Sequence, residues 1–160
     1  QMGYCYPTTR LTCNPTIIDP ATKNGTCPSA SPPSACVRRT FEDKGECLPL
    51  CDFAGTMSCD ATHHCVFFDA TVDSKGKPTR DTFKGLTCME NPQNPKVEGQ
   101  DCSYVDECAR GYQCNNVLAG DYKCRELCIV GDSTICPNDK TCRDVFKAGP
   151  GQPGLCTPNQ

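Results

Sequence analysis

Cysteine is the residue that most constrains how this chain can fold. Seventeen of its 160 residues are cysteine, whereas leucine, isoleucine, valine and phenylalanine together number only 25 and tryptophan is absent. A domain of this size normally buries a large aliphatic core, and so small a core would not offset the conformational entropy lost on folding. Covalent cross-links are therefore expected to replace the missing core, and disulfides are the usual form in a short cysteine-dense chain.

Composition and charge exclude several classes of protein. The net charge of −3 is spread over both signs, so no basic face is expected to bind nucleic acid. No apolar run approaches the roughly 20 residues that a membrane span needs.

The cysteine content also predicts a compartment. Disulfides persist outside the reducing cytosol, so we expect a secreted, extracellular or cell-surface protein, with the periplasm as an alternative. The chain begins Gln1-Met2-Gly3 without an apolar signal segment, which is typical of a mature exported protein. Asn24 begins an N-glycosylation sequon, a candidate modification site if the host is eukaryotic.

A duplicated cysteine spacing divides the chain. Gaps of three, seven and five residues separate four cysteines that begin at Cys47, and the same gaps recur 77 positions later from Cys124. Each run is followed by a further cysteine near a Gly-Leu step. Identical gaps at matched positions indicate an internal repeat. The matched framework comprises Cys47, Cys51, Cys59, Cys65, Cys88, Cys124, Cys128, Cys136, Cys142 and Cys156.

The repeat predicts two modules. Residues 1–88 form module 1, which holds nine cysteines and begins with an extension over residues 1–26. Residues 102–160 form module 2, which holds eight. Residues 89–101 contain two Asn-Pro pairs and a glycine, and are expected to form a linker. The predicted fold class is small and disulfide-rich, with two tandem cystine-stapled modules of short antiparallel β-hairpins and irregular loops.

Two hairpins can be located from strand-forming residues and turn signals. In module 1, a strand over residues 65–68 leads into a turn at 73–77 and a returning strand at 79–88. In module 2, residues 112–114 and 122–124 are the expected strands. Long helices are not expected, because prolines and glycines recur every few residues.

The odd number of cysteines makes Cys5 a candidate for an intermolecular disulfide or a free thiol. The early cysteines of the two modules match in order, and these are Cys13, Cys27 and Cys36 against Cys102, Cys108 and Cys114. Cys5 is then the surplus residue. The hypothesis is that Cys5 forms a disulfide with a second chain, which would be another copy of this protein or a different one. The alternatives are a buried or capped thiol, or a partner lost to proteolysis.

Few residues offer catalytic chemistry. The only histidines, His63 and His64, stand beside Cys65, and the equivalent positions of the second run hold Lys140 and Thr141. No acid that would orient a histidine base is evident. We therefore expect both histidines to be solvated loop residues, rather than a general base or metal ligands, and we expect no enzymatic activity.

Metal and cofactor sites are not expected. Most cysteine gaps are wider than those of zinc sites. Asp69, Asp73 and Asp81 lie in the module 1 hairpin, but the alternating aspartate series of a calcium loop is absent. The chain also lacks the Cys-x-x-Cys-His motif that attaches haem. The sequence thus predicts no cofactor.

Aromatic residues are candidates for contact with protein partners, because interfaces are enriched in them. Tyr4 and Tyr6 flank Cys5. Phe67 and Phe68 are consecutive, so in a strand they point to opposite faces. These four residues form the predicted interface set, with packing against cystines as the alternative for the two phenylalanines.

The second half resembles a known type of module. Glu107 precedes the second cysteine of that half, Gly111-Tyr-Gln leads into the third, and Leu127 precedes Cys128. This pattern resembles the tandem cysteine-rich modules of exported and surface proteins of myxobacteria and related bacteria, most of which are uncharacterised. The resemblance covers residues 99–156 well and 46–88 fairly, and it implies an extracellular disulfide-bonded module. A weaker likeness is to colipase- and dickkopf-type cysteine-rich domains, whose adjacent Cys-Cys pair is missing here.

These features favour a non-enzymatic extracellular protein with a structural or adhesive role. It would be a subunit or accessory part of a surface assembly that acts through protein–protein contacts, including contacts with itself through Cys5. The alternative is a soluble effector, such as a protease inhibitor or a receptor antagonist. A loop over residues 73–80 carries Lys75, Lys77 and Arg80, which a trypsin-like protease would recognise.

Overall fold

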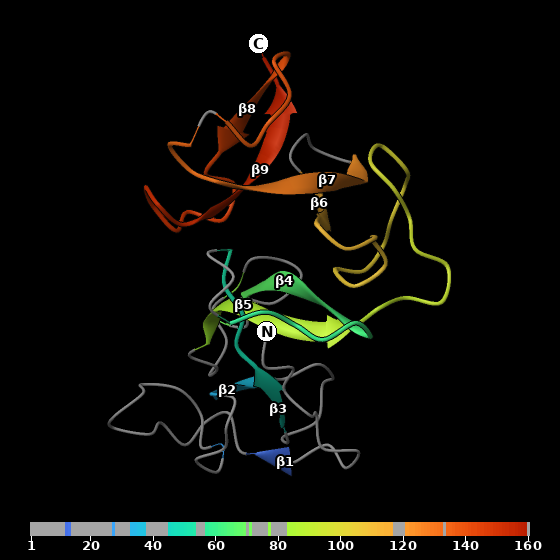
Figure 1. The fold of residues 1–160 in the computed structure, drawn as a ribbon, viewed down its shortest axis with the longest axis vertical. Coiled ribbons are helices and arrows are strands. Elements are labelled where there is room, and N and C mark those ends of the chain that lie inside the picture. Colours follow the sequence, from blue (N-terminus) through green and yellow to red (C-terminus); the bar gives the residue numbers. More distant parts are fainter. Residues whose placement is uncertain are drawn as a thin grey trace. The chain divides into compact units, whose positions relative to one another are not determined.

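The computed structural model describes residues 12–13, 27, 33–37, 45–53, 57–69, 71, 77, 83–116, 121–132 and 134–159. The regular structure of these residues consists of strands (Figure 1). They are β1 (Thr12–Cys13), β2 (Ser34–Val37), β3 (Gly45–Pro49), β4 (His63–Asp69), β5 (Lys84–Glu90), β6 (Tyr112–Asn116), β7 (Tyr122–Ile129), β8 (Lys140–Arg143) and β9 (Pro153–Pro158). Over the described ranges, no helix is long and apolar enough to cross a membrane.

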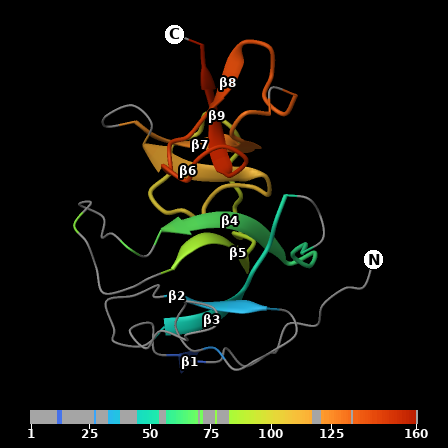
Figure 2. The ribbon, with the colours of Figure 1, turned by 90° about the vertical axis from the view of Figure 1, so that its left-hand side faces the viewer.

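The strands pair into short sheets. Their orders are β1-β3-β2, β4-β5 and β6-β7-β9-β8, and the pairings for which the register is known are antiparallel (Figures 1 and 2). The predicted fold class, small and disulfide-rich with short antiparallel strands, is confirmed.

Both predicted hairpins are present, as β4 with β5 and as β6 with β7. Strand β4 begins at His63, two residues earlier than expected, and β5 begins only at Lys84. Most of the connection between them lies outside the described residues. The sheets formed by β1, β2 and β3 and by β8 and β9 were not expected, because strands of two to six residues give too short a pattern to stand out.

The chain divides into two compact units. Unit 1 comprises residues 1–61 and 67–88, and unit 2 comprises residues 62–66 and 89–160. Strand β4 therefore begins in unit 2 and continues in unit 1.

The segment predicted as a linker, residues 89–101, contributes to the structure of unit 2. Lys96 forms a bridge with Cys108, and Asp101 forms one with Lys123. The backbone N–H of Gly99 donates to the carbonyl of Cys124 at 2.9 Å. Proline removes only its own N–H, so the intervening residues still offer backbone groups to a neighbouring strand.

The disulfides follow one pattern through the chain. We group the cysteines into four consecutive quartets: quartet 1 (Cys13, Cys27, Cys36, Cys47), quartet 2 (Cys51, Cys59, Cys65, Cys88), quartet 3 (Cys102, Cys108, Cys114, Cys124) and quartet 4 (Cys128, Cys136, Cys142, Cys156). In quartets 1, 3 and 4 the first cysteine bonds the third and the second bonds the fourth. Quartet 2 has the same second-to-fourth bond, Cys59–Cys88, and its other two cysteines are also disulfide-bonded.

Strand pairing places the third and fourth cysteines of a quartet opposite each other. The opposed pairs are Cys36 with Cys47, Cys114 with Cys124, and Cys142 with Cys156. Directly opposite residues project from the same face of a sheet. Each of these cysteines nevertheless bonds a cysteine from the segment before the hairpin, so the two disulfides of a quartet lie side by side on one face.

A third segment completes each quartet. The first cysteine pairs with the residue two positions before the fourth, as Cys13 does with Gly45 and Cys128 with Gly154. In quartet 3 the N–H of Cys102 donates to the carbonyl of Tyr122 at 3.0 Å. In quartet 2 the N–H of Cys51 donates to the carbonyl of Leu86 at 3.3 Å. The strand that bears the fourth cysteine is thus central in all four quartets.

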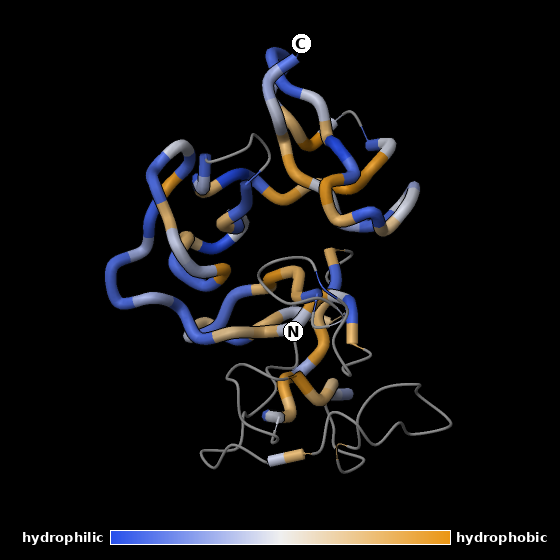
Figure 3. The backbone as a smooth tube through the Cα atoms, turned by 180° about the vertical axis from the view of Figure 1, so that it is seen from behind, coloured by the Kyte–Doolittle hydropathy of each residue, from blue (hydrophilic) through white to orange (hydrophobic). Residues whose placement is uncertain are grey.

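Sulfur supplies much of the interior. Of the twenty buried apolar residues in the described part of the chain, eleven are cysteines. Figure 3 shows hydrophobic residues in short stretches, interrupted by hydrophilic ones. This arrangement agrees with the expectation that disulfides take the place of an aliphatic core.

We expect peptide mapping of the unreduced protein to return this pairing. Cleavage after Glu107, Arg110 and Lys123 separates the four cysteines of quartet 3. Digestion with Glu-C and trypsin at mildly acidic pH, where thiolate exchange is slow, should give a peptide with Cys102 linked to one with Cys114. A direct Cys114–Cys124 link would contradict the first-to-third pattern.

Candidate functional site

Several residues predicted as sites lie outside the described residues. These are Cys5, Tyr4, Tyr6 and Asn24. The structure does place the two phenylalanines: Phe67 is 4 % exposed, and Phe68 is half-buried. The assignment of Phe67 to an interface needs correction, because a side chain packed in the interior is not available to a partner.

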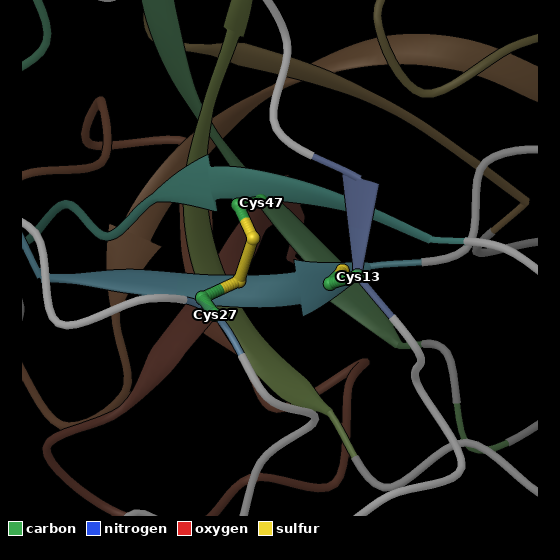
Figure 4. Close-up of side chains that lie close together, drawn as sticks. All are labelled: Cys13, Cys27 and Cys47. Carbon is green, nitrogen blue, oxygen red and sulfur yellow. A yellow bond between two sulfur atoms is a disulfide. The ribbon is translucent and has the colours of Figure 1, made fainter.

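The sixteen cysteines from Cys13 onward are engaged in disulfides. All ten members of the matched framework are bonded, as are Cys13, Cys27, Cys36, Cys102, Cys108 and Cys114. Their sulfurs gather in groups of three within 4.8 Å of one another, as Cys13, Cys27 and Cys47 do in Figure 4. Those groups consist of neighbouring disulfides, and so many disulfides indicate folding in an oxidising environment.

Quartet 3 and the segment before it carry exposed apolar residues that sequence reasoning missed. Val97, Tyr104 and Tyr122, which we call the tyrosine surface, are 54 %, 69 % and 50 % exposed. The hydrogen bond from the N–H of Cys102 to the carbonyl of Tyr122 places Tyr122 beside the segment that leads to Tyr104. Tyr112 and Tyr122 both lie on the face of the β6–β7 pair that bears Cys114 and Cys124. Tyr112 packs against the cysteines of quartet 3, whereas Tyr122 stays exposed, and no local sequence signal separates the two.

The loop that bears Tyr104 is held at both ends and from within. Its ends are the bonded residues Cys102 and Cys108. The Glu107 carboxylate accepts hydrogen bonds from the Lys96 ammonium and from the N–H of Ser103, both at 2.8 Å. These bonds stabilise the charged form, so the pKa of Glu107 lies below its ordinary value, with Lys96 the main cause. Tyr104 is therefore displayed on an ordered loop.

Charged residues next to Tyr122 are paired with each other. The Lys123 ammonium lies 3.0 Å from Asp101 and 3.7 Å from Asp121, and the Arg125 guanidinium lies 3.2 Å from Asp121. The bond to Asp101 is the main reason that the pKa of Lys123 lies above its ordinary value. Tyr122 is thus bordered by charged residues that are paired with each other.

The histidines are in a strand, and the expectation of solvated loop residues is wrong. Both lie on β4, and His64 is 0 % exposed. Neither ring nitrogen of His64 makes a hydrogen bond to the described residues. Burial is the main reason that the pKa of His64 lies below 6.5. His63 is only partly buried, and its Nδ1 lies 2.9 Å from the Thr62 hydroxyl.

The chain was compared with protein-family models, with curated proteins and with solved structures, and no match was found in any of the three.

Proposed function

We propose that this is a non-enzymatic extracellular protein that acts through protein–protein contacts, as a structural or adhesive part of a surface assembly. The observation that supports the proposal most directly is the tyrosine surface on the disulfide frame of quartet 3. Tyr104 is more than half exposed and Tyr122 is half exposed. The chain contains few aromatic residues, so two exposed tyrosines are a large share of them.

A rigid frame favours this kind of role. Two disulfides and the Glu107 hydrogen bonds order the Tyr104 loop before any partner arrives. Less conformational entropy is then lost on binding, which raises affinity for a given contact area. Tyrosine is also among the residues that contribute most to binding energy at interfaces.

The partner class includes a second copy of this chain. The sixteen cysteines other than Cys5 are disulfide-bonded, so parity within the chain leaves Cys5 for a bond to another molecule or for a free thiol. A covalent dimer through Cys5 would bring two tyrosine surfaces into one particle and increase its avidity for a repeated partner.

We expect the purified protein to associate with itself, with distinct contributions from Cys5 and from the tyrosine surface. Non-reducing gels should show a dimer that reductant and Cys5→Ser abolish. In sedimentation experiments, the Tyr104→Ser/Tyr122→Ser variant should weaken non-covalent association by at least about 30-fold, because loss of even one central interface residue costs about 2 kcal/mol.

Ile135→Ser is the matched control, since Ile135 is an exposed apolar residue of quartet 4. It should leave association unchanged. Wild-type protein that sediments as a monomer at every concentration and gives no dimer band on a non-reducing gel would contradict self-assembly.

The second candidate function is a protease inhibitor. Lys77 is exposed in the connection between β4 and β5, and the Lys84–Asp69 ion pair at 3.5 Å joins the two strands. A cystine-braced loop with an exposed lysine is a suitable bait for a trypsin-like protease. Tight inhibition of trypsin that Lys77→Ala removes would favour this function over the assembly role.

A further inference from the structure

His64 is a buried titratable residue for which the proposed function has no use. Its side chain is fully enclosed, and its two ring nitrogens make no hydrogen bonds to the described residues. A polar group buried without partners is costly, and the cost rises steeply if the group becomes charged. His64 therefore marks a place where the structure depends on the protonation state of one side chain.

The surroundings of His64 belong to compact unit 2. In addition to the pairing of β4 with β5, hydrogen bonds to two backbone carbonyls join residues 62–66 to the rest of that unit. The guanidinium of Arg110 donates to the carbonyl of His63 at 2.6 Å, and the N–H of Asn91 donates to the carbonyl of Thr62 at 2.8 Å. The attachment therefore involves two parts of unit 2, one around Asn91 and one around Arg110.

Quartet 4 contains the same strand arrangement without a buried histidine. The N–H of Asn159 donates to the carbonyl of Asp139 at 3.1 Å, which is the counterpart of the bond from Asn91 to Thr62. The position equivalent to His64 is Thr141, which lies 77 residues later and is exposed. The strand pairing thus forms without a histidine, and burial of this position is specific to residues 62–66.

We propose that His64 makes the attachment of residues 62–66 within compact unit 2 sensitive to acid, so that the segment is held at neutral pH and released as the ring takes up a proton. The ring is enclosed away from water, and the cost of burying its charge outweighs the help that Asn91 and Asp106 give to the charged form, so the charged ring is better accommodated when the segment opens to water.

The balance between burial and the groups around His64 determines the direction of the effect. Burial is the largest influence and lowers the pKa of His64, while Asn91 and Asp106 raise it and Arg110 and His63 lower it. The pKa in the attached state therefore lies below the ordinary 6.5 of the released segment. The released state binds more protons, so the attachment is intact above 6.5 and weakens below it, by up to about tenfold per pH unit until the lowered pKa is reached.

Amide hydrogen exchange, corrected for intrinsic rates, tests this directly. The N–H of Asn91 reports the attachment, and the N–H of Asn159 is the internal control from quartet 4. Between pH 7.5 and pH 5.0 we expect the protection factor of Asn91 to fall by about tenfold, while that of Asn159 stays constant. Equal behaviour of the two amides would overturn the proposal.

Two variants and one direct titration complete the test. His64→Leu should remove the pH dependence at Asn91, whereas His63→Gln, the matched control on the same strand, should retain it. NMR titration of the wild-type rings should give a pKa below 6.5 for His64. A value at or above 6.5 would overturn the proposal. The titration uses the wild-type protein, so it tests the proposal even if His64→Leu does not fold.

Discussion

Reduction of the disulfides is expected to unfold the protein completely at neutral pH, without denaturant. The disulfides of quartets 1, 3 and 4 close sequence separations of 12 to 23 residues, and each loop of this size contributes about 3 kcal/mol. Together they exceed the net stability of about 5–15 kcal/mol of an ordinary domain. The apolar residues that remain are too few to compensate.

The measurement is the spread of backbone amide signals in a two-dimensional NMR spectrum, before and after reduction with a phosphine and alkylation of the thiols. We expect the dispersed signals of the oxidised protein to collapse into the narrow range of an unfolded chain. The control is the same alkylation without reductant, which should leave the spectrum unchanged. Dispersed signals in the fully alkylated protein would show that the fold does not depend on the disulfides.

Gly154→Ala is expected to be strongly destabilising. Gly154 lies in β9 between β7 and β8, and an added Cβ would approach the Arg143 carbonyl to 2.5 Å, the Val130 Cγ2 to 2.8 Å and the Cys142 sulfur to 3.0 Å. The carbonyl and the disulfide cannot move without breaking the sheet. Overpacking of this kind costs about 3 kcal/mol, measured as the loss in the free energy of urea unfolding with the disulfides intact.

Two further glycines make the comparison specific. Gly45 occupies the equivalent place in quartet 1, and its Cβ would lie 2.8 Å from the Cys36 sulfur. Gly45→Ala should therefore also destabilise, by about 1–3 kcal/mol. At Gly85 in β5 the added Cβ would meet only the Phe83 ring, at 3.3 Å. Gly85→Ala should be neutral or stabilising by about 0.5–1 kcal/mol, and equal losses at Gly85 and Gly154 would refute the steric explanation.

The cysteine spacing was sufficient to match the modules, because gaps between residues can be read without knowing the fold. It placed Cys13, Cys27 and Cys36 against their counterparts in module 2, and the observed disulfides of quartets 1 and 3 have that register. The spacing did not reveal that each module contains two quartets of one design. The number of residues between cysteines differs from one quartet to the next, because the loops differ in length. What the quartets share is their strand pairing and their disulfide connectivity, and neither can be read from the spacing.

The linker and the histidines show where local reasoning fails. Two Asn-Pro pairs suggested an unpaired segment, yet Lys96 and Asp101 form bridges to other strands. The threonine at the position equivalent to His64 suggested a solvated site, and Thr141 is indeed exposed, but His64 is buried. In both cases, pairing or burial depends on contacts with residues distant in sequence, and a local sequence pattern carries no information about those contacts.

For this protein, the sequence by itself determined the class of fold and the means of its stabilisation, because a chain with many cysteines and few large apolar residues has few other ways to offset its entropy. Only the tertiary structure decided which cysteines bond and which side chains are exposed. Eight cysteines in one module allow 105 pairings, and the choice among them is made by strands that bring Cys114 opposite Cys124 and yet direct each to a different partner.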